Sequence, residues 1–267
     1  MLTTASANLK ILPDKLKNHF LTALAERKMV FEFNQDYFSV AYLSEYKVAI
    51  NLVDIVNRFS AEELIELQNS EKRKGIKLIH LWEDVWLTKR EQVIFRLKSL
   101  FGLNKTIHGR KTEIQKIDKP TSDNFLDENH LQGTVSSRYK FGLYYLDELV
   151  AVATFSALRR MNHSHNYKSI ELIRFAVLGG FSITGGLSKL IKHLKTLLDP
   201  DDIMTYADCD WSSGDAYIKI GFEQVSILQP QYFVLSEYMN RKLIKDIIEG
   251  NEREVFNSGS LKFILRF

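Results

Sequence analysis

Hydrophobic positions in the first hundred residues follow two different spacings. Residues 8–28 carry Leu16, Phe20 and Leu24 on one face at helical spacing, which predicts an amphipathic helix. Short runs of alternating, β-branched or aromatic residues predict strands, and two longer segments with charged faces predict further helices. After the first helix, we expect strands at 29–33, 37–43 and 47–53, a helix at 61–74, a strand at 76–82 and a helix at 89–100.

The next part of the chain changes to longer apolar runs. Residues 110–118 alternate between polar and apolar side chains and predict a strand, and residues 122–131 predict a helix. Residues 139–155 consist of two apolar runs that reverse near Asp147, which predicts a β-hairpin.

The strongest pattern lies between residues 171 and 198. An apolar run that contains Arg174 predicts a buried strand, and glycine pairs follow it at 179–180 and 185–186. Leucine and isoleucine then recur at helical spacing until Asp199-Pro200 ends the helix. A strand, a glycine loop and a helix present free amides and a positive dipole end to an anion. An ordinary tight connection is the alternative, because glycine also serves turns and caps.

The rest of the pattern completes an α/β (α+β) fold. Further elements are expected as a strand at 202–208, a short helix around Tyr217, strands at 224–228 and 231–235, a helix at 237–249 and a hairpin at 254–267. Residues 104–109 interrupt the periodicity. We therefore expect three parts: residues 1–103, residues 104–236 and an extension over residues 237–267.

Composition narrows the functional classes. The net charge of +3 permits an anionic partner without requiring one. The single cysteine, Cys209, excludes an internal disulfide and a cysteine-based zinc site, and no metal is expected. No apolar run is long enough to span a bilayer and no charged-then-apolar leader is present, so a cytoplasmic protein without a membrane partner is expected.

The order of elements in residues 1–103 resembles the core of PD-(D/E)XK and Vsr-like nucleases. Residues 75–86, GIKLIHLWEDVW, resemble the fourth strand of Vsr-like homing-endonuclease domains. The resemblance implies a carboxylate cluster that holds Mg²⁺. However, Asn51 stands where the metal-binding glutamate is expected, and the upstream aspartate position falls near Val40. We therefore expect a degenerate nuclease-like domain, a remnant or a binding platform; a working nuclease is the alternative.

Residues 107–236 resemble the GNAT superfamily of acyltransferases. The resemblance rests on the order of elements and on DAYIKIGFEQV, in which Tyr217 precedes a Gly-Phe turn. It implies that the glycine loop binds the pyrophosphate of acetyl-CoA or a related acyl-CoA and that Tyr217 protonates the departing thiolate. The loop departs from the family pattern, because Leu187 replaces its last glycine or alanine. The residues that the resemblance assigns to this cofactor are Thr184, Gly185, Gly186 and Leu187.

A narrower resemblance is to phage Mom-type proteins, which add a carbamoylmethyl group to DNA adenine using a GNAT-like fold. The residues that match by order and approximate spacing are Arg174, Ser188, Asp208 and Tyr217. In the hypothesis that follows, an acyl-like group is transferred to an amine, on a nucleic acid in the Mom-like version. Asp208 would accept the proton of the amine, Tyr217 would protonate the leaving group, and Arg174 would orient a carboxylate or phosphate. Each of the four residues also has an ordinary explanation, such as an ion pair, a cap or core packing.

The second hypothesis is a non-catalytic nucleic-acid-binding protein. Basic stretches with interleaved aromatic residues at 89–98 and 138–145 favour it. Residues 157–169 form a polar, basic loop that contains His163 and His165, and we expect this loop to be a positively charged rim of the site.

Overall fold

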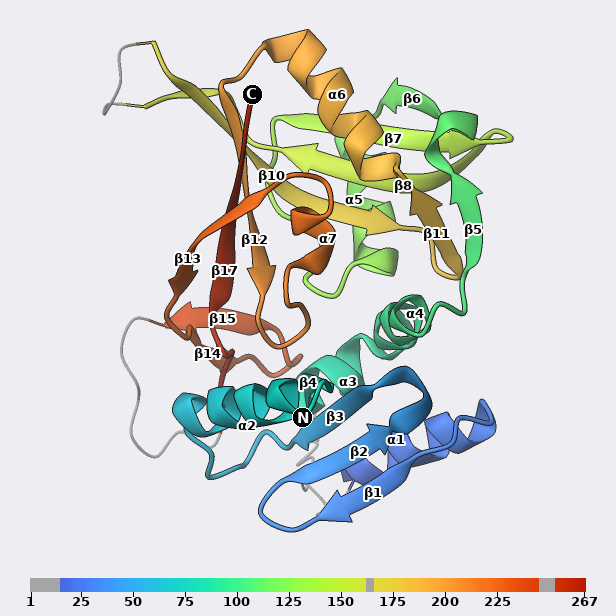
Figure 1. The fold of residues 1–267 in the computed structure, drawn as a ribbon, viewed down its shortest axis with the longest axis vertical. Helices are drawn as coiled ribbons and strands as arrows, with labels where there is room; N and C mark the ends of the chain where they lie inside the picture. The colour runs from blue at the N-terminus through green and yellow to red at the C-terminus, as the bar shows by residue number, and fades with distance from the viewer. Residues whose placement is uncertain (1–14, 162–165, 245–252) are drawn as a thin grey trace, which may run out of the picture.

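A computed structural model describes residues 15–161, 166–244 and 253–267 (Figure 1). Two sheets organise this part of the chain, one of four strands near the N-terminus and one of eight strands. A two-stranded and a three-stranded sheet complete the strand pairing. The α/β (α+β) class expected from the sequence is confirmed. Within the described residues, no helix is long and apolar enough to cross a bilayer.

The N-terminal layer, residues 15–100, consists of four α-helices, the short 3₁₀ helix η1 and the sheet β1-β2-β3-β4. β1, β2 and β3 are antiparallel neighbours, whereas β4 runs parallel to β3. All residues of β3 are buried, which explains its nearly continuous apolar sequence. The elements are α1 (Lys15–Glu26), β1 (Glu32–Gln35), β2 (Ser39–Leu43), η1 (Ser44–Tyr46), β3 (Val48–Val53), α2 (Ala61–Arg73), β4 (Lys77–Trp82), α3 (Glu83–Thr88) and α4 (Arg90–Leu100).

The predicted apolar face of the first helix is confirmed. Leu16, Phe20 and Leu24 are buried in the N-terminal core, where the Phe20 ring meets Trp86 edge-on at 5.2 Å between centroids. Residues 8–14 of the expected helix, like His163 and His165 of the expected basic loop, lie outside the described residues.

The large sheet has the strand order β13-β17-β12-β10-β8-β7-β6, and β9 pairs with β10. α6 lies on one face of this sheet and α5 on the other (Figure 1). The expected hairpin at 139–155 is present as β7 and β8. The elements of this part are β5 (Lys105–His108), η2 (Gly109–Lys111), β6 (Glu113–Lys116), α5 (Lys119–Asn129), β7 (Tyr139–Tyr145), β8 (Glu148–Phe155), β9 (Arg159–Arg160), β10 (Lys168–Val177), β11 (Phe181–Thr184), α6 (Gly186–Leu198), β12 (Asp202–Asp208), α7 (Asp215–Ile218) and β13 (Glu223–Leu228).

The C-terminal segment differs from the sequence prediction. Where a helix was expected at 237–249, β15 (Arg241–Ile244) pairs with β14 (Tyr232–Leu235), and residues 245–249 lie outside the described residues. The expected C-terminal hairpin is wrong, because β16 (Glu254–Phe256) pairs with β14 while β17 (Ser260–Arg266) inserts between β12 and β13. The insertion buries Phe263 completely in the core of the large sheet, which favours this partner over a local one.

Candidate active site

β10 and β12 lie side by side only along their first residues. Their parallel pairing ends at Glu171 and Met204; farther along, β10 continues beside β8 and β12 beside β17. The Thr205 hydroxyl donates a hydrogen bond to the Leu172 carbonyl at 2.9 Å, at the point where the strands separate. The two strands therefore diverge like the arms of a V that opens toward α4 (Figure 1).

The segment that follows α5 crosses this opening. Arg174 on β10 donates from Nε to the Gly133 carbonyl at 3.2 Å. One residue away, Gln132 donates from Nε2 to Asp208 Oδ2, at the end of β12, at 3.2 Å. Residues 132–133 thus connect the two arms of the V.

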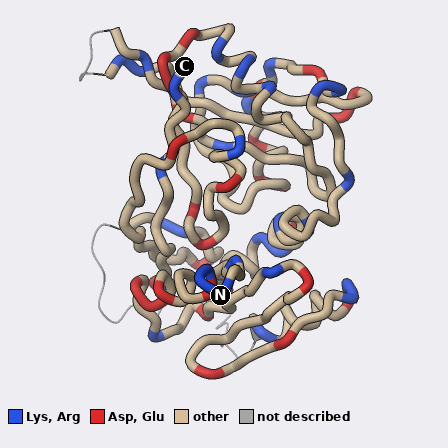
Figure 2. Tube along the Cα trace, viewed as in Figure 1, with Lys and Arg blue, Asp and Glu red and all other residues tan. Residues whose placement is uncertain are grey.

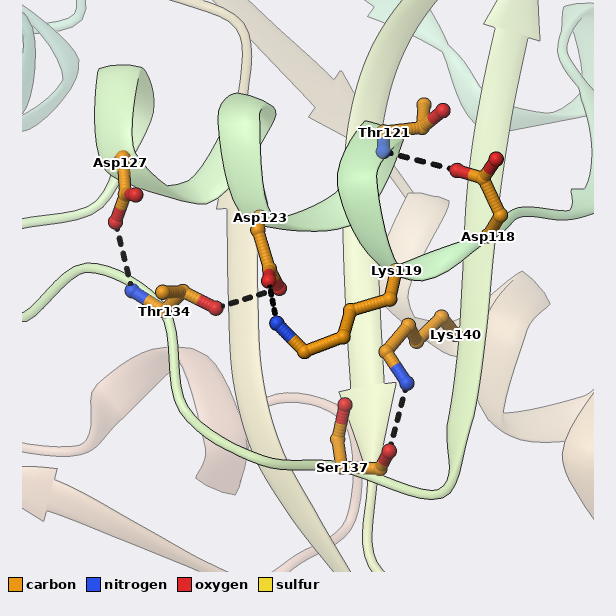
Figure 3. A network of polar contacts seen from close by, with 8 residues as sticks. All are labelled: Asp118, Lys119, Thr121, Asp123, Asp127, Thr134, Ser137 and Lys140. Carbon is orange, nitrogen blue, oxygen red and sulfur yellow. Dashed lines mark hydrogen bonds and ion pairs between the residues drawn. The ribbon is translucent and has the colours of Figure 1, made fainter.

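Polar contacts with α5 hold the continuation of this segment in place (Figure 3). Thr134 donates its amide to Asp127 Oδ1 at 3.0 Å and its hydroxyl to Asp123 Oδ1 at 2.7 Å. Lys119 forms an ion pair with the other oxygen of Asp123, and Asp118 caps the first turn of α5. Because these contacts fix the backbone next to Gly133, they also fix the groups that cross the V.

Asp208 ends β12 with a half-buried carboxylate. Burial raises the pKa of Asp208 to about 7, and repulsion from the nearby Asp210 carboxylate acts in the same direction. The Asp210 amide, which donates to Asp208 Oδ1 at 3.0 Å, opposes this rise without cancelling it. A carboxylate whose pKa lies near neutrality can accept the proton of an amine and is therefore suited to general base catalysis.

Tyr217 lies on α7, and its ring packs against Phe222 and Phe263, each with a centroid separation of 5.5 Å. These contacts fix the ring. Its hydroxyl is within electrostatic range of Arg96 and Arg174, and no hydrogen bond to it is formed within the described residues. The hydroxyl is therefore available to a substrate.

Arg96, His130 and Arg174 lie near this hydroxyl. Arg96 is exposed and the other two are half-buried, yet desolvation lowers the pKa of all three. The pKa of His130 falls to about 3, because the charges of Arg174, Arg96 and Lys89 add to the effect of burial. The three side chains are thus partly desolvated while they keep contact with solvent.

The predicted glycine loop is partly a strand. β11 pairs in parallel with β5, so the supposed linker at 104–109 and the loop after β10 form a small sheet. The chain then turns at Gly185, whose φ of 75° is in the left-handed region that favours glycine. α6 begins directly after this turn.

The first turn of α6 leaves amides for an anion. Those of Gly186, Leu187 and Ser188 have no capping side chain and no backbone acceptor within the described residues. On one side, η2 packs so tightly that a Cβ on Gly109 would lie 2.9 Å from the Gly186 nitrogen. On the other side, Thr184 and Gly185 are exposed. This exposed side fits a phosphate group of the expected cofactor.

The structure brings together three of the four predicted catalytic residues: Arg174, Asp208 and Tyr217 surround the V. Ser188 lies in the first turn of α6, and within the described residues no hydrogen bond joins it to these three. Sequence reasoning missed Gln132 and His130, because a polar residue in a loop carries no periodic or motif signal. The basic stretch at 89–98, which contains Arg96, was apparent in the sequence, but its residues gave no indication that it lies near the site.

In the N-terminal sheet, the positions that would hold the carboxylates of a nuclease are buried. Val40, Asn51 and His80 are neighbours across β2, β3 and β4, and all are buried. Asn51 Nδ2 donates to His80 Nδ1 at 3.1 Å, and His80 Nε2 donates to the Leu64 carbonyl at 3.1 Å. Burial lowers the pKa of His80 to about 3, so the imidazole is neutral. No group of three His, Cys, Asp or Glu able to hold a metal occurs within the described residues.

Comparison with known proteins gives structural similarity alone. No protein-family model matches the sequence, and no curated protein matches it. Similar solved structures include an acetyltransferase from Bacillus subtilis in complex with CoA (18% identity, TM-score 0.38) and Naa50 from Arabidopsis thaliana with a bisubstrate analogue (15%, 0.39). A third is a GNAT family acetyltransferase from Elizabethkingia anophelis with acetyl-CoA bound (13%, 0.35). Each match covers 59% of this chain and 99% of the other. At these identities and TM-scores, the similarity assigns no activity or substrate to this chain.

Proposed function

We propose that the protein is an N-acyltransferase that transfers an acyl group from acetyl-CoA or a related acyl-CoA to an amine. The main support for the proposal is the opening between β10 and β12. Asp208 lies at the end of β12, and Tyr217 lies on α7, next to this opening. The elements around it follow the order strand, glycine turn, long helix, strand and short helix, which agrees with the GNAT resemblance of the sequence.

Each residue has one role in this proposal. When bound, acyl-CoA supplies an acyl group activated as a thioester, and the first amides of α6 hold one of its phosphates. Asp208 accepts the proton that the amine loses as it attacks the acyl carbon. Tyr217 donates a proton to the departing sulfur. Arg174 uses two of its donors on the carbonyls of Gly133 and Ile173, and its remaining N–H groups orient the substrate.

The test of this proposal combines ligand binding with product formation. Acetyl-CoA at about one hundred times its Kd should stabilise the folded protein by about 2.7 kcal/mol. This is a rise of several degrees in Tm, at roughly 2–4 °C per kcal/mol for a chain of this size. Release of free thiol from acetyl-CoA in the presence of amine acceptors measures the reaction. If acetyl-CoA leaves Tm unchanged and no thiol is released with any acceptor, the proposal is wrong.

A finer version of the proposal places the amine on a nucleic acid, as in the Mom-type resemblance. Arg174, Asp208 and Tyr217 support this version, because they are the matching residues that meet at the V. Acetylation of a base in single-stranded or duplex DNA, detected by mass spectrometry of the nucleosides, tests it. Transfer to free amines together with no transfer to DNA would limit the proposal to its coarser form.

We also propose that residues 1–103 have a nuclease-like fold without nuclease activity. The buried row of Val40, Asn51 and His80 supports this reading, because it offers neither carboxylates nor solvent access to a metal. Incubation with plasmid DNA and Mg²⁺ should leave the DNA intact. Mg²⁺-dependent cleavage that is lost on substitution of His80 would contradict it.

A further inference from the structure

α4 of the N-terminal layer forms the wall opposite the V. The Phe95 ring lies against Gly179, in the loop after β10, so closely that a Cβ on this glycine would come within 2.4 Å of it. Gln92 donates from Nε2 to the Asp127 carbonyl of α5 at 2.8 Å. Figure 2 shows basic segments along α4.

Cations from the two layers meet at Gly133. Lys89 Nζ lies 3.9 Å from the position that a Cβ on Gly133 would occupy, and Arg174 Nε lies 3.2 Å from the Gly133 carbonyl. Arg96, farther along α4, is within electrostatic range of Tyr217 and His130. Two cations of the N-terminal layer therefore face the same opening as the arginine of β10.

Lys89 donates from Nζ to the Asp127 carbonyl at 3.4 Å, and Asp127 Oδ1 lies 2.9 Å from the same Cβ position on Gly133. Within the described residues, none of Lys89, Arg96 and Arg174 forms a direct ion pair with a carboxylate. Glu171 attracts Arg174 from nearby without making contact. Because Arg96 and Arg174 are desolvated and form no ion pair within the described residues, an anion that binds near them would offset this cost.

We propose that Lys89, Arg96 and Arg174 form a phosphate-binding subsite for a single-stranded nucleic acid that serves as the acceptor. The N-terminal layer then supplies half of the acceptor site. The role of the subsite rests on the proposed acyl transfer, whereas its binding of nucleic acid does not.

The spacing of the cations favours a strand over a single phosphate. Lys89 and Arg96 are two helical turns apart, roughly 10 Å along the axis, which is more than one phosphate group spans. The donor has its own place for phosphate at the first turn of α6, which lies on the other face of the sheet from α5 (Figure 1). The subsite on the α5 side is thus left to the acceptor.

Fluorescence anisotropy with a labelled single-stranded DNA of about 12 nucleotides tests the subsite. Lys89→Gln and Arg96→Gln should each weaken binding roughly tenfold at low salt. Each should also reduce the slope of log K against log salt by about 0.7. Arg90→Gln is the matched control: it removes the same charge from the same helix, but Arg90 lies over the Trp86 ring, 5.2 Å from its centroid. This control should bind DNA as the wild type does.

Additional variants and measurements distinguish the possible outcomes of this experiment. Arg96→Lys should restore most of the salt slope, and urea unfolding checks that each variant is folded. An acetyl-CoA thermal shift should be the same in wild type, Lys89→Gln and Arg96→Gln. The subsite is refuted if wild type does not bind DNA, if Arg96→Gln binds as tightly as wild type, or if Arg90→Gln loses as much. It is also refuted if Arg96→Gln loses its response to acetyl-CoA, because the cations would then serve the donor. If acetyl-CoA does not change the Tm of the wild type while Arg96→Gln weakens DNA binding, the proposed acyl transfer is refuted and the proposed subsite is supported.

Discussion

Replacing Asp208 by asparagine should stabilise the protein above about pH 7 and strongly lower its activity. The folded pKa of Asp208, about 7, is higher than the ordinary value of 3.8. The folded state therefore loses stability through this group as the pH rises from about 4 to about 7. A rise of this size corresponds to about 4 kcal/mol above pH 7. Asparagine is neutral and similar in shape, so the variant avoids this loss.

Two effects reduce the gain to about 2 kcal/mol. Asparagine presents an amide group where Gln132 now donates to Asp208 Oδ2, and loss of that bond costs about 1 kcal/mol. The half-buried carboxylate also keeps some solvent contact, which lowers the electrostatic cost of its charge. In addition, loss of a general base should lower kcat/KM by about two to four powers of ten.

Urea unfolding at about pH 5 and about pH 8 measures the difference. The advantage of Asp208→Asn over wild type should be larger at the higher pH, and the rate of wild type should rise through about pH 7. Asp36→Asn, at an exposed position between β1 and β2, is the control and should show neither effect. An equal stability difference at both pH values would refute the raised pKa, and an unchanged rate would remove Asp208 from the reaction.

Three further predictions concern other parts of the molecule. Tyr217→Phe should lower kcat by about two to four powers of ten with little change in Tm, and an unchanged rate would exclude Tyr217 as the acid. Arg241→Met leaves the buried Asp84 carboxylate without its two hydrogen bonds of 2.7 and 2.9 Å, so urea unfolding should show a loss of about 3–5 kcal/mol. Adding Asp84→Asn should recover part of it; no recovery would mean that the pair is not coupled. The wild type should lose stability as the pH falls below about 6.5, because its buried neutral imidazole, with a pKa of about 3, resists protonation. His80→Gln should reduce the slope of this loss by up to about 1.4 kcal/mol per pH unit. The same slope in both proteins would contradict this.

Elements with a strong local period could be predicted from the sequence. The hairpin β7–β8 and helix α6 were expected because each carries its own hydrophobic pattern over more than two turns or two strands. β5 and β11 were missed because each is a strand of four residues, which is too short to show a period; β5 is largely exposed, and β11 has a single exposed residue. β17 appeared to be half of a hairpin because its alternation identifies a strand, whereas the choice of partner depends on the core around Phe263.

The candidate site shows the same limit. Asp208 ends β12, Tyr217 lies on a short helix, and Arg174 is a charged residue within the largely apolar strand β10, so each one stands out in the sequence. Gln132 and Arg96 reach the site only through tertiary packing of α4 and α5. Their role therefore depends on contacts between segments far apart in the chain, which no pattern along the sequence records.

The turn after Asp208, the proposed base, contacts the N-terminal layer as well as the large sheet. Gln68 of α2 donates to the Cys209 carbonyl at 2.9 Å, and the His80 amide on β4 donates to the Asp210 carbonyl at 3.1 Å. Trp211 is buried in the N-terminal core rather than in that of the large sheet. Asp208 lies next to these anchors, so its position depends on the N-terminal layer as much as on β12. If the proposed transferase is correct, the N-terminal layer is needed to position its base, whether or not that layer has chemistry of its own.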